Sequence, residues 1–242
     1  MTLKSKPYFL SFVLFLLNIG LIAQEKGNDP YSIIDSLKSR LETIEDYTAE
    51  IEIEVDVAFI RMPVKHATIL YKKPDKIKFR SDEFIMLPKR GLSNSLTKIL
   101  EEPFTAIYLG QEIIGEETLH VIRIVPLGKN PKIIVATWWI NSNSYLIVKN
   151  ESNSKNNGSY YVDFIYNDPS IILPTELIIS FDIEEMQIPL KFIGKSKGME
   201  VDKSKIDKPQ KGKVSIRFSD YKINMQLKDE LFDDDLGEEN YD

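Results

Sequence analysis

The stretch Ala49-Glu-Ile-Glu-Ile-Glu-Val-Asp-Val57 decides the fold class of this chain. Apolar and acidic residues alternate along it, which is the period of a β-strand with one buried and one solvated face. Because successive side chains of a strand point to opposite faces, Ile51, Ile53 and Val55 are predicted to face the interior. Pairs of the acidic residues could do acid–base chemistry, but so regular a row is typical of a solvated sheet face.

Further strands are predicted to follow this one in hairpin succession, separated by turn-forming residues such as glycine, proline and asparagine. They are 67–73, 76–80, 104–109, 118–125, 133–140, 145–150, 160–166, 176–181 and 213–224, with weaker ones near 84–87 and 189–193. So many strands with few helices between them exclude a doubly wound parallel sheet. The pattern predicts a mainly β protein built as an antiparallel meander, in which 194–212 is a long loop.

Two amphipathic helices are predicted beside the strands. The first spans Asp29–Glu45, where a capping aspartate precedes Pro30 and apolar residues recur at helical spacing. The second spans Leu92–Glu102 and ends before Pro103. The two apolar stripes either roof a concave apolar face too wide for the sheet's own side chains, or complete a solid core.

The N-terminus has the three parts of a secretory signal peptide. Two lysines precede the apolar run 7–22, and the small residue Ala23 follows it. Cleavage after residue 23 would leave one domain over 24–242, whose acidic tail, 233–242, is expected to be disordered. The alternative is an uncleaved membrane anchor, although the run is short for a span that needs about 20 apolar residues.

Composition excludes several classes of site. The chain has no cysteine, which excludes disulfides, cysteine zinc sites, a thiol nucleophile and a lipid-modified N-terminal cysteine. Its net charge of −6 disfavours nucleic acid and anionic membrane surfaces as partners. Neither His66 nor His120 has an acidic partner at metal-ligand spacing, and no phosphate loop or serine elbow is present. We therefore expect no metal, no cofactor and no enzymatic activity.

Two further features concern the faces of the later strands. Arg123 alternates with Leu119 and Val121, so it either points inward, where a buried guanidinium needs an anion, or extends from a strand edge to water. The adjacent pair Trp138-Trp139 places one indole ring on each face of its strand.

The order of these elements resembles that of the LolA-like periplasmic lipoprotein-sorting proteins, over most of the chain after residue 23. The stretches that carry the resemblance are Asp46-Tyr-Thr-Ala49, Tyr71–Arg80, Gly115–Pro126, Trp139–Leu146, and Phe218–Asn224 with Leu231-Phe232. The resemblance implies an incomplete antiparallel β-barrel of about eleven strands roofed by helices. It also implies a monomeric, non-lipidated periplasmic carrier that takes lipoprotein acyl chains or other lipids from an inner-membrane donor transporter to an outer-membrane acceptor. Envelope sensors that bind a membrane-protein partner share this type of sheet, so the sensor function is the alternative.

The same resemblance implies a cavity lined from the first strands, the two helices and the later strands. The candidate lining residues are Leu37, Leu41, Ile51, Ile53, Val55, Ile69, Tyr71, Ile77, Phe79, Leu96, Ile99, Leu100, Arg123 and Trp138. A shift of one residue in the strand register would move the strand candidates to the other face.

Overall fold

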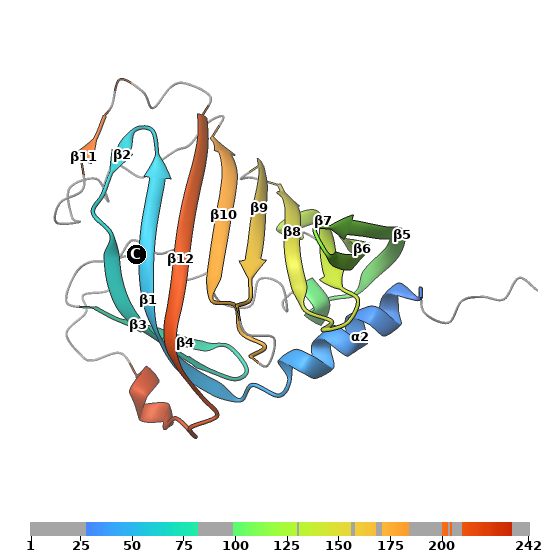
Figure 1. The fold of residues 1–242 in the computed structure, drawn as a ribbon, viewed down its shortest axis with the longest axis horizontal. Helices are drawn as coiled ribbons and strands as arrows, with labels where there is room; N and C mark the ends of the chain where they lie inside the picture. Colours follow the sequence, from blue (N-terminus) through green and yellow to red (C-terminus); the bar gives the residue numbers. More distant parts are fainter. Residues whose placement is uncertain are drawn as a thin grey trace, which may run out of the picture.

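The computed structural model describes residues 28–81, 99–129, 131–155, 158–167, 171–183, 200–202, 204 and 210–233. Within them the strands form a single antiparallel sheet, and the helix α2 (Pro30–Leu41) packs across one end of it (Figure 1). The predicted signal peptide, the strands near 84–87 and 189–193, residues 92–98 of the second helix and the tail from 234 lie outside the described residues.

The described part of the chain contains twelve strands and a C-terminal 3-10 helix, η4 (Asp229–Phe232). The strands are β1 (Asp46–Val57), β2 (Ile60–Arg61), β3 (Lys65–Lys72), β4 (Lys76–Arg80), β5 (Phe104–Ile114), β6 (Glu117–Pro126), β7 (Ile133–Asn141), β8 (Ile147–Ser154), β9 (Gly158–Ile165), β10 (Glu176–Ile183), β11 (Glu200–Val201) and β12 (Gln210–Ile223).

The sheet is open, which confirms the prediction of a mainly β, incomplete antiparallel barrel. Its order runs β11-β2-β1-β12-β10-β9-β8-β7-β6-β5, while β3 and β4 continue from the β1 edge that also carries β2. Strands β5–β7 turn away from the plane of the remaining strands, so the sheet is strongly bent (Figure 1). It is not a simple meander, because the last strand, β12, lies between β1 and β10. The first and the last strand of the sequence are therefore neighbours in the sheet.

Helix α2 begins as predicted but ends earlier. The Asp29 carboxylate accepts the backbone N–H of Ser32 at 3.1 Å and Pro30 is the first helical residue. The helix ends at Leu41 rather than Glu45, because the N–H groups of Thr43 and Ile44 form i→i−3 bonds. The N–H of Glu45 bonds instead to the Asn224 side chain at 2.7 Å.

Three strands also differ from their predicted form. The two-residue strands β2 and β11 pair with one another, so part of the predicted loop 194–212 belongs to the sheet. Strand β5 continues to Ile114 because Gly110, at φ 121°, absorbs a register shift that would otherwise end the ladder. The prediction missed β2 and β11 because their pairing joins segments distant in the sequence, and it ended β5 at Gly110 because a glycine was taken as a turn.

Candidate functional site: the inner face of the sheet

One row of paired residues crosses the inner face of the sheet, the face on which α2 packs. The row consists of Ile122, Trp138, Asn150, Val162, Ile179, Val214 and Val55, each directly opposite the next on the neighbouring strand. Directly paired residues place their side chains on the same face. Asn150 is the one polar member, so this row is apolar from β6 to β1 with a single polar interruption.

Two apolar clusters share this face. The helix cluster combines α2, residues 99–100 and strands β5–β9, and its buried members are Ile33, Ile34, Leu37, Ile99, Leu100, Ala106, Ile122, Ile124, Ala136, Trp138, Ile140 and Ile147. The strand cluster comes from β1, β3, β4, β10 and β12, and its buried members are Ala49, Ile51, Ile53, Ala67, Ile69, Ile216 and Phe218. In the described residues α2 therefore belongs to one half of the inner face and not to the other.

Helix α2 is fastened to the sheet by an apolar stripe and by its contacts with the edge strand β5. Ile34 and Leu37 are each 1% exposed. The Tyr31 ring stacks on Phe104 with centroids 6.0 Å apart, and its hydroxyl oxygen accepts the backbone N–H of Ala106 at 3.2 Å. These contacts are local to one turn of the helix and one edge of the sheet.

Most of the candidate lining residues lie on the inner face. Leu37, Leu41, Ile99, Leu100 and Trp138 belong to the helix cluster, while Ile51, Ile53, Val55, Ile69, Ile77 and Phe79 belong to the strand cluster. Tyr71 pairs with Tyr47 of β1 and stacks on it at 5.1 Å between centroids. Leu96 lies outside the described residues.

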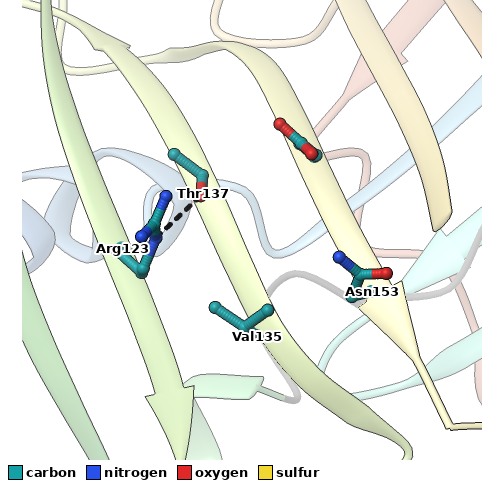
Figure 2. Close-up of a pocket in the computed structure, with 5 residues that line it drawn as sticks. Arg123, Val135, Thr137 and Asn153 are labelled. Atoms are coloured by element: carbon teal, nitrogen blue, oxygen red, sulfur yellow. Dashed lines mark hydrogen bonds between the residues drawn. The ribbon is translucent and has the colours of Figure 1, made fainter.

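Arg123 is a correction, because it lies on the opposite, outer face. Its neighbours Ile122 and Ile124 are fully buried in the helix cluster, so alternation turns Arg123 outward, where it is exposed. Figure 2 shows its Nε donating to Thr137 Oγ1 at 3.5 Å, beside Val135 and Asn153. The hollow there measures 120 Å³, well below the about 300 Å³ of a small ligand pocket, so it is too small for an acyl chain.

The outer face also carries the acidic row of β1, as predicted for a solvated surface. Arg217 donates to the Glu52 carboxylate and, at 2.8 Å, to that of Glu54, and these bonds raise the pKa of its guanidinium. Thr68 donates to Glu50 at 3.0 Å. The carboxylates are held in ordinary cross-strand pairs, which favours a structural role over acid–base chemistry.

The inner face holds three polar features that the sequence did not predict. The indole N–H of Trp138 is buried and has no hydrogen-bond partner. Next to it, the Ser152 hydroxyl donates to Asn150 Oδ1 at 2.9 Å, and both residues are 1% exposed. His120 is 6% exposed, its Nδ1 lies 3.2 Å from the Tyr108 hydroxyl, and burial lowers the pKa of its imidazole.

The position of Asn150 could not be read from strand alternation. Ile140 pairs with Ile147 while Trp139 pairs with Lys149, so Val148 is an extra residue in β8. This bulge places Ile147 and Asn150 on the same face although they are three residues apart. A bulge depends on the partner strand and leaves no mark in the local apolar pattern.

Comparisons with known proteins bear on the fold. No family profile and no curated protein matches this chain. A DUF1329 family protein from Desulfovibrio piger ATCC 29098 aligns with a TM-score of 0.53 at 12% identity, over 85% of this chain and 98% of its own. A putative outer membrane lipoprotein-sorting protein domain from Vibrio parahaemolyticus aligns with a TM-score of 0.51 at 12% identity, over 86% of this chain and 97% of its own. The chain has the LolA-like fold.

The LolA-like fold confirms what the sequence resemblance implies about architecture. At 12% identity the two alignments establish the fold only. The kind of ligand has to be inferred from the residues of the inner face. Among the described residues, no helix combines the length and the apolar character that crossing a membrane requires.

Proposed function

We propose that this protein is a carrier that binds the acyl chains of lipoproteins or other lipids against the inner face of its sheet. The observation that supports it most directly is the apolar row from Ile122 to Val55. Seven strands at ~4.8 Å spacing make this row about 29 Å wide. The twelve residues of α2, at 1.5 Å per residue, extend only ~18 Å. The helix is therefore long enough to cover part of the apolar row and too short to cover all of it.

In the closed state the helix cluster is filled by its own side chains, so acyl binding requires α2 to move. Ile33, Ile34 and Leu37 hold the helix down, and burial of such side chains stabilises by ~1.5–3 kcal/mol each. An acyl chain of fifteen methylenes offers ~12 kcal/mol at ~0.8 kcal/mol per CH₂. The acyl chain can therefore replace the contacts of α2, and because the lost contacts offset much of the gain, the net free energy of binding is small enough to permit release.

Export and delivery complete the proposal. The N-terminal sequence favours secretion by a cleaved signal peptide, and the absence of cysteine excludes a lipid-modified N-terminal cysteine. A monomeric periplasmic carrier would receive cargo from a donor in the inner membrane and release it at an acceptor in the outer membrane. Binding and release need no bond to be made or broken, so no catalytic group is required.

The two tryptophans provide a test with a matched control, since they lie on opposite faces of β7. In Trp139→Phe the remaining indole, Trp138, reports on the helix cluster; in Trp138→Phe the remaining Trp139 reports on the outer face, where it donates to Glu112 at 2.6 Å. A brominated acyl chain quenches an indole that it touches. We expect quenching of Trp138 and not of Trp139.

Native mass spectrometry of the gently purified protein complements this test, and bound lipid is expected. Absence of bound lipid, together with no quenching of Trp138, would refute the carrier function. If a single inner-membrane protein then co-purified in stoichiometric amounts, the result would support the alternative function, an envelope sensor that binds a membrane-protein partner.

A further inference from the structure

The buried polar group that most needs a partner is the indole N–H of Trp138. Trp138 is 0% exposed, and its Nε1 has no hydrogen-bond acceptor. Buried N–H groups are almost always paired, because water can no longer satisfy them. An unpaired N–H in an apolar core therefore either destabilises the fold without any function, or forms its hydrogen bond with a ligand when the ligand binds.

Asn150 lies directly opposite Trp138 on β8, on the same face. Its carbonyl oxygen is taken by the Ser152 hydroxyl, at 2.9 Å, which leaves the amide NH₂ as the donor end of the side chain. An indole N–H and an amide NH₂ therefore belong to directly paired residues of adjacent strands, on the same face of the sheet. Two donors placed in this way fit one ligand acceptor.

The surroundings define which acceptor. The other members of the row, from Ile122 to Val55, are apolar, so the row contains no charged side chain. A carboxylate or phosphate placed there without a cation would lose its hydration without compensation. A neutral carbonyl oxygen accepts two hydrogen bonds and loses far less on leaving water.

We propose that Trp138 and Asn150 form a subsite for the carbonyl oxygen of an ester- or amide-linked acyl chain. The inference rests on the carrier function proposed above and adds the position and chemistry of the cargo's head. The carbonyl sits between β7 and β8 under α2, and the methylene chain follows the apolar row toward Ile179 and Val214. When α2 closes over an empty protein the indole N–H is left unpaired, so cargo lowers the free energy of the opened face more than apolar contact alone would.

The indole N–H signal in nitrogen-15 NMR of the full exported chain tests this directly, and Trp139→Phe assigns it. The probes are methyl dodecanoate, dodecanamide and a linear alkane of the same length. Both carbonyl probes are expected to shift the Trp138 Nε1–H signal downfield, and the alkane is not. If the carbonyl probes bind and leave that signal where the alkane leaves it, the subsite is refuted while the carrier stands. If no probe binds, the carrier function itself fails.

Affinities of variants supply a second measurement. Trp138→Phe replaces the indole with a smaller apolar ring that has no N–H, so affinity for methyl dodecanoate should fall about fivefold more than affinity for the alkane. Asn150→Val should do the same. The control Ile179→Val shortens an apolar member of the row and should weaken binding of the ester and of the alkane by equal factors. Equal losses for Trp138→Phe would overturn the proposal.

Discussion

The side-chain oxygen of Asn224 accepts the backbone N–H of Glu45 at 2.7 Å, across 179 residues of sequence. The Asn224 amide in turn donates to the Thr43 carbonyl at 2.9 Å, and the backbone N–H of Asn224 donates to the Asp46 carbonyl at 2.8 Å. The segment between α2 and β1 is thereby tied to the end of β12. If α2 moves to admit cargo, this tie is the fixed point about which it turns.

Removing the Asn224 side chain is expected to loosen this pivot. Asn224 has φ 57°, a conformation that glycine adopts freely, so Asn224→Gly removes the hydrogen bonds without adding strain. Loss of the three side-chain bonds of Asn224, of which the one from the Asp46 N–H is long at 3.4 Å, should lower the free energy of unfolding by about 1–2 kcal/mol in urea denaturation. Amide exchange in 31–41 should accelerate, whereas unchanged exchange there would show that the tie does not hold the helix.

Cross-linking α2 to β5 should stop uptake of lipid. The chain has no cysteine, so Tyr31→Cys with Phe104→Cys places the only two thiols in the protein where two rings now stack at 6.0 Å. A short bismaleimide joins them and holds the helix on the sheet. Quenching of Trp138 by a brominated acyl chain should disappear after cross-linking and persist in the same double variant left unlinked. Equal uptake by both forms would show that cargo does not enter beneath α2.

The sequence predicted β1 well and the faces of β6 poorly, for one physical reason. In β1 the outer positions are acidic, so alternation separates the faces without ambiguity. In β6 both faces are apolar: Leu119 is as fully buried as Ile122 on the opposite side. Period-two alternation then carries no information about which face is inward, so the sequence left both orientations of Arg123 open and its inclusion among the lining candidates was wrong.

The polar part of the candidate site was beyond prediction for a different reason. Asn150 reaches the inner face through the bulge at Val148, and its neighbour Trp138 comes from another strand. Only the register between β7 and β8 brings the two together. The apolar candidates, by contrast, needed only the pattern of their own strands.

Acidification is expected to destabilise the fold through His120. Burial lowers the pKa of its imidazole below the ordinary 6.5, so the folded protein holds this side chain neutral while the unfolded chain takes up a proton. The contribution is fully present above pH 6.5 and is lost as the pH falls from there toward the lowered pKa of the folded state. Thermal melts of the wild type and His120→Gln across pH 5–8 should diverge in slope only in that window. Parallel curves would assign the acid sensitivity to other groups.

Gly212 is predicted to be the glycine of the inner face that least tolerates a methyl group. It pairs with Val57 on one side and Phe181 on the other, and an added Cβ would lie 2.5 Å from Phe181 Cε2 and 3.1 Å from Val57 Cγ2. Val57 is buried and the Phe181 ring packs against its cluster, so the ring has to shift away from these contacts to admit the methyl group. Gly212→Ala should therefore lower the free energy of unfolding by about 1–3 kcal/mol.

The matched control is Gly128→Ala, where the added methyl meets the end of the flexible Glu102 side chain. That carboxylate can rotate into water, so the second variant should unfold within about 0.5 kcal/mol of the wild type. A Gly212→Ala protein as stable as Gly128→Ala would mean that the Phe181 ring moves freely on the inner face.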